Sequence, residues 1–77
     1  MPDQKEIMQE LAQSLGLSVA DLDRHALLRE DLNLGPIEFN DLISNLSEHF
    51  DIIMDPEELS NVKTVDDLVI LIEDNLI

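Results

Sequence analysis

The chain has 77 residues, a net charge of −14 and 44% apolar side chains, which indicates a single small domain, too hydrophobic to be disordered. Only four Lys and Arg residues oppose 18 Asp and Glu residues, so the chain lacks the basic surface that nucleic-acid binding requires, and we expect protein partners with basic surfaces instead. No cysteine is present, which excludes disulfides and thiolate metal sites.

Neither end of the chain predicts export or membrane insertion. The N-terminus shows no basic segment followed by an apolar run, and the longest apolar run, residues 68–72, is too short to cross a bilayer. We therefore expect a cytoplasmic monomer that binds no membrane.

The first helix is predicted to run from about Asp3 to Leu15. Asp3 and Glu6 can form a capping pair at its start, and Gly16 is a natural helix end. The residues at helical spacing that form its apolar stripe are Ile7, Met8, Leu11 and Leu15.

Residues 16–35 form a connection that is long for a compact domain. Apolar residues are spaced through it and are expected to anchor it to the core: Val19, Leu22, Leu27, Leu28, Leu32 and Leu34. Ser18, followed three residues later by Asp21, can cap a single helical turn within this connection.

A strong start signal for a second helix stands at Gly35-Pro36. Proline suits the first helical position because its fixed φ fits a helix and its missing N–H has no intrahelical partner there. Gly35 is the expected cap, and the Glu38 carboxylate can reach back to the Gly35 N–H. The helix is predicted over about Pro36 to Phe50, with an apolar stripe of Phe39, Leu42, Ile43, Leu46 and Phe50.

Two further helices are predicted before the end of the chain. Asp55 before Pro56 repeats the start signal and predicts a short helix of one or two turns. Thr64 as cap, with Asp67 three residues later, predicts a last helix. The run 68–72 fits a buried strand on periodicity alone, but the cap, the length and the lack of a partner strand favour a helix. The sequence thus predicts one all-α domain over residues 1–77, with three main helices and one short one.

Residues 31–43, with the segments on either side, resemble an acyl carrier protein. In that family a loop ending in an Asp-Leu-Gly-like turn leads to Asp-Ser-Leu, and the serine opens the second helix and carries phosphopantetheine. Here residues 31–34, Asp-Leu-Asn-Leu, match the approach, and Ile37-Glu38 matches the leucine and the acidic residue after the serine. Gly35-Pro36 stands in place of Asp-Ser. The resemblance covers essentially the whole chain and implies a four-helix acyl-carrier-like bundle with a long loop between helices 1 and 2.

The resemblance places Pro36 at the attachment position of the family's cofactor, phosphopantetheine. Proline has no nucleophilic atom, so we expect no phosphopantetheine and no other cofactor on this chain. Ser44 and Ser47 lie inside the predicted second helix, too far along it to replace the missing serine.

In acyl carriers the outer face of the second helix docks onto Arg and Lys residues of synthases and transferases. Carried over position by position, that face consists here of Ile37, Glu38, Asp41 and Glu48. Asn40 and Ser44 replace residues that are usually apolar, and Ser47 replaces a common acid, so the face is less charged and less apolar than is usual. A plain solvated acidic surface is the alternative interpretation.

The family also sequesters acyl chains between its helices. The residues that would line such a space are Leu46, Met54, Leu59, Val62, Leu68 and Leu71. Leu59 and Leu68 are larger than expected there, which favours an ordinary packed core.

No residue pattern predicts catalysis or a metal site. His25 and His49 lack metal-ligand spacing and are expected on the surface, and no nucleophile–base pair is recognisable. The sequence therefore predicts a non-catalytic acyl-carrier-like domain that docks on a synthase, ligase or transferase of fatty-acid, lipid or polyketide metabolism. Two alternatives stay open: an acyl or aminoacyl carrier modified at another residue or a serine-less variant of one, and an acidic interaction module unrelated to lipid metabolism.

Overall fold

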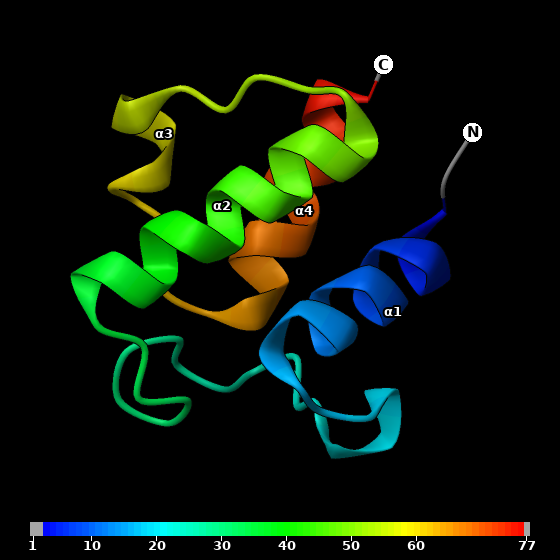
Figure 1. Ribbon diagram of the computed structural model, residues 1–77, viewed down its shortest axis with the longest axis vertical. Helices are drawn as coiled ribbons and strands as arrows, with labels where there is room; N and C mark the ends of the chain where they lie inside the picture. The colour runs from blue at the N-terminus through cyan, green and yellow to red at the C-terminus, as the bar shows by residue number, and fades with distance from the viewer. Residues whose placement is uncertain (1–2, 77) are drawn as a thin grey trace.

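The computed structural model describes residues 3–76, so the outermost residues of the predicted 1–77 domain lie outside the described range. Four α-helices and one 3₁₀ turn follow one another along the chain (Figure 1): α1 (Gln4–Leu15), η1 (Val19–Asp21), α2 (Pro36–Phe50), α3 (Pro56–Leu59) and α4 (Val65–Asn75). Across residues 3–76 the extended backbone forms only an isolated antiparallel bridge between Leu27 and Thr64. The predicted all-α fold with three main helices, one short helix and a long connection is confirmed.

The helices begin and end at the residues that carry the predicted signals. The Asp3 carboxylate accepts a hydrogen bond of 2.9 Å from the Glu6 N–H at the start of α1. Gly16 ends that helix at φ 72°, in the left-handed region that glycine adopts without strain. The Asp55 carboxylate accepts a hydrogen bond of 2.9 Å from the Glu57 N–H and caps the single turn of α3.

The core lies between α1, α2 and α4. Its largest fully buried side chains come from these helices and from the long connection: Ile7, Leu11, Leu28, Leu46, Leu68 and Ile72. Among residues 3–76 no polar or charged side chain is buried. The acidic residues are thus all at least partly solvated, and burial of aliphatic side chains supplies the main stabilisation of the fold.

The connection between α1 and α2 is anchored by Leu22 and Leu28, which are 6% and 1% exposed. The prediction that Val19 is also an anchor is wrong: its side chain is 42% exposed, because η1 buries none of its three residues. Ser18 precedes η1 as predicted, but its hydroxyl donates to the Asp21 carboxylate at 2.8 Å and accepts no backbone N–H.

The start of α4 holds this connection in place. The Leu28 N–H donates to the Lys63 carbonyl at 2.9 Å, and the Val65 N–H donates to the Ala26 carbonyl at 3.0 Å. These bonds flank the Leu27–Thr64 bridge. They give the connection paired backbone groups although it has no regular secondary structure.

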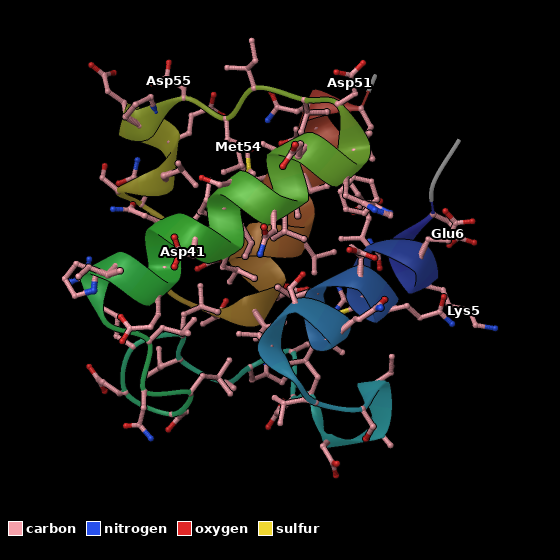
Figure 2. All side chains as sticks on the ribbon, in the orientation of Figure 1. Lys5, Glu6, Asp41, Asp51, Met54 and Asp55 are labelled. Carbon is pink, nitrogen blue, oxygen red and sulfur yellow. The ribbon has the colours of Figure 1, made fainter. Side chains whose placement is uncertain are left out.

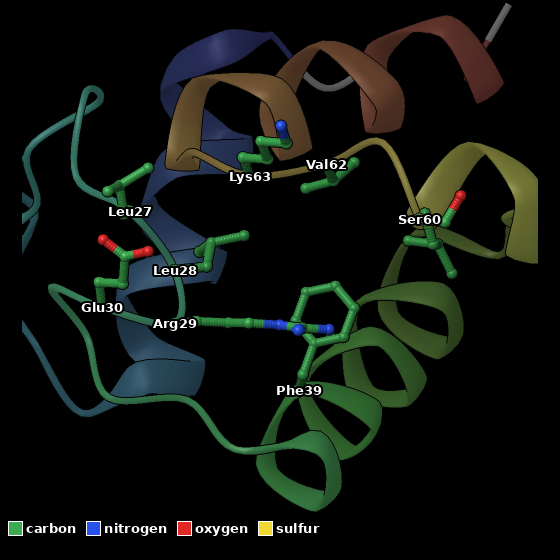
Figure 3. Close-up of a pocket in the computed structure, with 9 residues that line it drawn as sticks. Leu27, Leu28, Arg29, Glu30, Phe39, Ser60, Val62 and Lys63 are labelled. Atoms are coloured by element: carbon green, nitrogen blue, oxygen red, sulfur yellow. The ribbon is translucent and has the colours of Figure 1, made fainter.

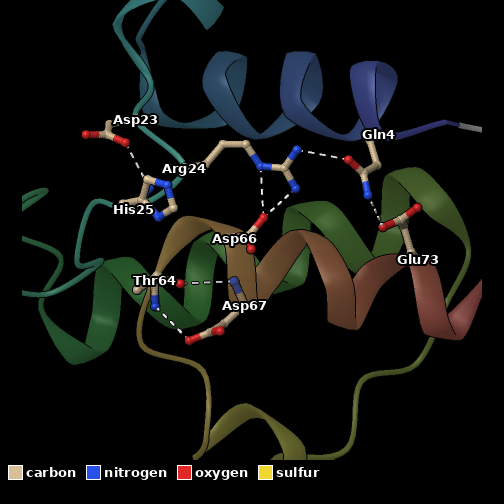
Figure 4. Close-up of polar contacts among 8 residues, drawn as sticks. All are labelled: Gln4, Asp23, Arg24, His25, Thr64, Asp66, Asp67 and Glu73. Atoms are coloured by element: carbon tan, nitrogen blue, oxygen red, sulfur yellow. Dashed lines mark hydrogen bonds and ion pairs between the residues drawn. The ribbon is translucent and has the colours of Figure 1, made fainter.

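A polar cluster around Arg24 joins the same connection to α1 and α4 (Figure 4). The Arg24 guanidinium donates through Nε to Asp66 Oδ1 at 2.8 Å and through Nη1 to Gln4 Oε1 at 2.9 Å. Gln4 in turn donates to Glu73 Oε1 at 2.7 Å. One side chain from an irregular segment therefore links two helices.

Candidate functional site

The candidate site is the start of α2, where the long connection becomes a helix. Gly35 is the N-cap, with φ −78° and ψ 177°, and Pro36 is the first helical residue. The Pro36 ring is exposed. The Phe39 N–H donates to the Gly35 carbonyl at 2.9 Å and closes the first turn. The sequence signal for this start is confirmed.

Glu38 folds back over this cap. A Cβ built on Gly35 would lie 2.8 Å from Glu38 Oε2, so glycine leaves room for the carboxylate. Within residues 3–76 no hydrogen bond joins that carboxylate to the Gly35 N–H, so the predicted bond is not formed. The carboxylate nevertheless lies at the positive end of the α2 dipole, where a negative charge is favoured.

The outer face of α2 carries the predicted docking residues, and all four are exposed. Ile37 is 74% exposed, which is high for a large apolar side chain. Ile37, Asp41 and Glu48 follow each other at intervals of a helical turn or two, so they lie on one side of α2. Figure 2 shows Asp41 on the outer surface of this helix. Glu38 lies beside them, at the capped end.

The predicted acyl-lining residues do not share one space. Leu46 and Leu68 are fully buried in the core. Leu59 and Val62 line a pocket of about 340 Å³ between the connection, α2 and α3, and Leu71 lines a separate one with Val62. The residues of the larger pocket that the sequence did not predict are Leu27, Leu28, Arg29, Glu30, Phe39, Ser60 and Lys63 (Figure 3).

The basic residues are the one feature of the sequence that could have indicated this pocket. Arg29 and Lys63 are half of the chain's four basic residues. Arg29 directly follows the buried Leu28, and Lys63 directly follows the partly buried Val62. The Leu28–Lys63 backbone bond, which brings the two segments together, has no sequence signature of its own.

The electrostatics of the start of α4 differ from those of α2. Thr64 and Asp67 form a reciprocal capping box, with Thr64 Oγ1 accepting from the Asp67 N–H at 3.1 Å. The backbone N–H groups of Thr64 and Lys63 both donate to the Asp67 carboxylate, each at 3.1 Å. These bonds lower the pKa of Asp67 below its usual value of 3.8, because they stabilise the charged form.

Residues 3–76 hold no group of three or more His, Asp or Glu side chains placed to bind a metal ion, and no helix among them has the length and apolar character to span a bilayer. His25 and His49 are both exposed, as predicted. His49 Nδ1 lies 3.5 Å from Glu10 Oε1, across the gap between α2 and α1.

Chemically, the start of α2 offers no group for covalent attachment. A proline ring has no hydroxyl and cannot form a phosphodiester, so Pro36 does not fit phosphopantetheine. The nearest hydroxyl further along α2 belongs to Ser44, which is exposed but lies roughly 12 Å along the helix axis. What this end of the helix does offer is an exposed apolar side chain bordered by carboxylates.

The helical bundle and the position of its second helix are those that the resemblance to acyl carriers implies. Residues 5–72 match the family model described as "Phosphopantetheine attachment site". The chain belongs to this family and is a carrier-protein domain related to acyl carrier proteins.

Individual relatives agree with this assignment. The acyl carrier protein of Buchnera aphidicola is 33% identical over 70 residues, 91% of this chain and 90% of that protein. The acyl carrier protein of an Exiguobacterium species is 27% identical over 71 residues, 92% of this chain and 90% of its own length. An acyl carrier protein homolog of Mycoplasmopsis pulmonis is 37% identical over 46 residues, 60% of this chain and 63% of the homolog.

Proposed function

We propose that this chain is an acyl-carrier-like protein without a prosthetic group, which acts by docking onto an enzyme of fatty-acid, lipid or polyketide metabolism. The observation that carries the proposal is Pro36. It stands, exposed, where the resemblance assigns the attachment serine, at a helix start that is otherwise intact. The chain keeps the scaffold on which a carrier presents its attachment residue but has no atom there to modify.

The docking part of the proposal rests on the outer face of α2. Ile37 exposes an apolar side chain whose hydration is unfavourable. The carboxylates of Glu38 and Asp41 lie beside it. A partner with a small apolar depression and surrounding Arg or Lys residues complements this arrangement. The partner classes that the resemblance implies are synthases, ligases and transferases.

The missing attachment site is tested by intact mass. The chain and its Pro36→Ser variant are incubated with coenzyme A and a broad-specificity phosphopantetheinyl transferase. We expect the mass of the chain to stay unchanged and the variant to gain one phosphopantetheine. A gain by the unaltered chain, followed by peptide mapping to Ser44 or another residue, would show instead a carrier modified elsewhere.

The docking face is tested by charge reversal. Glu38→Lys with Asp41→Lys raises the net charge from −14 to −10, since each exchange adds two charges. Asp21→Lys with Asp74→Lys makes the same change at exposed positions away from α2. Binding to a panel of carrier-dependent synthases, ligases and transferases is measured by biolayer interferometry at low and high salt.

We expect the α2 pair to weaken binding about tenfold or more at low salt, and the Asp21–Asp74 pair to have a much smaller effect. Equal weakening by both pairs would indicate a non-specific acidic surface, which is the second alternative. Binding to none of these enzymes would contradict the docking role, even if the mass experiment succeeds.

A further inference from the structure

A groove of about 270 Å³ lies where α3 and the turn after it meet α4. Its apolar surface comes from Val62 in that turn and from Ile70 and Leu71 on α4. Leu71 is 6% exposed and packs into the core, whereas Ile70 is 46% exposed, because it lies outside the buried stripe of α4. The fold thus leaves a large apolar side chain at the edge of a groove, where its hydration is unfavourable.

Three exposed carboxylates border this groove. Asp67 and Asp74 stand one helical turn before and after Ile70 on α4, and Glu58 comes from α3. Figure 4 shows Asp67 on the side of α4 that points away from α1, and two backbone N–H groups of the preceding turn hold its carboxylate there. The groove is therefore apolar in its centre and negative at its edge.

The charge of the groove is not balanced by the chain itself. The ion pairs within residues 3–76 involve neither Glu58 nor Asp74, and the net charge of −14 attracts cationic partners to the surface. A surface that complements the groove has an apolar projection bordered by positive charge. The volume lies below the roughly 300–1,000 Å³ of small-molecule pockets, so the groove accommodates side chains of a partner rather than a whole small ligand.

We propose that this groove docks a basic amphipathic helix of a partner protein. One apolar side chain of that helix enters between Val62 and Ile70, and its Lys or Arg residues pair with the carboxylates at the edge. Asp67 and Asp74 are two helical turns apart, roughly 10 Å along the axis, and a helix laid along α4 presents cations at the same spacing around an apolar residue.

This groove differs from the outer face of α2 in shape. The α2 face offers a protruding apolar side chain, Ile37, whereas the groove offers a recess. The two surfaces therefore take partners of different shape, and the groove does not rest on the proposed docking role of α2.

The probe is a synthetic peptide of two Lys-Leu-Leu-Lys-Lys-Leu-Leu repeats, blocked at both ends. Its counterpart has alanine in place of every leucine, which keeps the charge and the helix preference but removes most of the apolar surface. Each peptide is titrated into the ¹⁵N-labelled chain, and amide chemical shifts are followed by heteronuclear NMR. Thermal melts check that every variant of the chain stays folded.

The apolar edge is tested with Ile70→Asn. Its control is Val19→Asn, because Val19 is a β-branched residue of similar exposure, 42%, that lies on η1. We expect the leucine peptide to cause saturable shifts around Asn61, Val62 and Ile70, with an affinity about tenfold higher than that of the alanine peptide. Ile70→Asn should lose about fivefold in affinity for the leucine peptide, and Val19→Asn should lose much less.

The charged edge is tested with Glu58→Gln combined with Asp74→Asn. The control pair is Glu6→Gln with Glu30→Gln, at exposed positions outside the groove. Each pair removes two negative charges and changes the net charge from −14 to −12. At low salt we expect the groove pair to weaken binding of the leucine peptide about tenfold, with a smaller loss at high salt, and the control pair to have much less effect.

Four results would overturn the proposal. The leucine peptide causes no saturable shifts, or the alanine peptide binds as tightly as the leucine peptide. The shifts are confined to the start of α2, which assigns the peptide to the other face. A control variant weakens binding as much as the groove variant with which it is matched, which indicates a non-specific acidic attraction.

Discussion

Two helix starts in this protein are built in opposite ways. At α4, Thr64 and Asp67 form a complete capping box. The connection between α1 and α2 is hydrogen-bonded to the same region through Leu28 and Ala26. At α2, the cap is Gly35, which has no side chain to accept a hydrogen bond, and the first turn is Pro36. The start of α4 is closed by several hydrogen bonds, whereas the start of α2 depends on backbone preference and on the Glu38 carboxylate near the positive end of the helix dipole.

The difference separates a helix start that carries structural contacts from one whose side chains stay exposed. The interactions at α4 position the long connection, and through it the beginning of α2. The start of α2 is left with exposed Pro36 and Ile37 and with a carboxylate that folds over glycine. Substitutions near α4 should therefore change stability, and substitutions at the start of α2 should change recognition while the fold stays intact.

The largest expected effect comes from Leu28, the buried anchor of the connection. Leu28→Ala should lower the free energy of unfolding by about 3 kcal/mol, because it leaves a cavity next to α4. Urea denaturation measures this. Leu17→Ala, in the same connection but at a side chain that is 38% exposed, is the control and should cost less than about 1 kcal/mol. Equal losses would mean that the connection is not anchored at Leu28.

The next effect concerns the caps themselves. Thr64→Ala removes the hydroxyl that accepts the Asp67 N–H and should cost about 1 kcal/mol in urea denaturation. Pro36→Ser, at the other helix start, should cost about 0.5 kcal/mol, because only the restriction of the unfolded chain is lost. A larger loss for Pro36→Ser than for Thr64→Ala would contradict the contrast between the two starts.

The local signals at these starts were readable from the sequence because each depends on residues within one turn. Asp3, Gly16, Asp55 and Thr64 act on N–H or carbonyl groups a few positions away, so spacing alone identifies them. The exposure of the Ile37 side chain can be predicted in the same way, because Ile37 lies outside the apolar stripe that the helical period defines.

The long-range features were not readable in that way. Arg24 bonds to Asp66 and Gln4, which are distant from it in the sequence. The chain has 18 acidic residues, and nothing in the sequence says which of them pairs with Arg24. The pocket depends on the pairing of Leu28 with Lys63, and Val19 is exposed although it is as apolar as the residues that anchor the connection. Such pairings are decided by tertiary packing, which leaves no periodic pattern in a single sequence.

A smaller effect is expected from the Arg24 cluster. Arg24→Gln removes the charge pairing with Asp66 and should cost about 0.5 kcal/mol, since both side chains are more than one-third exposed and water screens their interaction. Asp66→Asn and the double variant complete a double-mutant cycle in urea denaturation. A coupling energy that disappears in high salt is expected, and strictly additive losses would show that the pair contributes nothing.

The smallest expected effect is the pH-dependent stability that Asp67 contributes at the start of α4. The Thr64 and Lys63 N–H groups lower the pKa of Asp67 below 3.8, so the ionised carboxylate favours the folded state. This stabilisation is fully present above the unfolded-state value and is lost as the pH falls through the lower folded-state pKa. Asp67→Asn should therefore destabilise the fold at pH 7 by less than Arg24→Gln does, because the Asp67 carboxylate is exposed and water screens its charge. The difference from the unaltered chain should vanish in acid.

The control for this measurement is Asp74→Asn, an exposed acid in the last turn of the same helix. A negative charge there opposes the helix dipole, so its removal should not destabilise the fold at pH 7. Acidification also relieves the repulsion among the remaining acids, but both variants share that relief, so only their differences from the unaltered chain are diagnostic. If Asp67→Asn and Asp74→Asn show the same pH profile, the carboxylate at the start of α4 has no special role, and the contrast between the two helix starts rests on Thr64 alone.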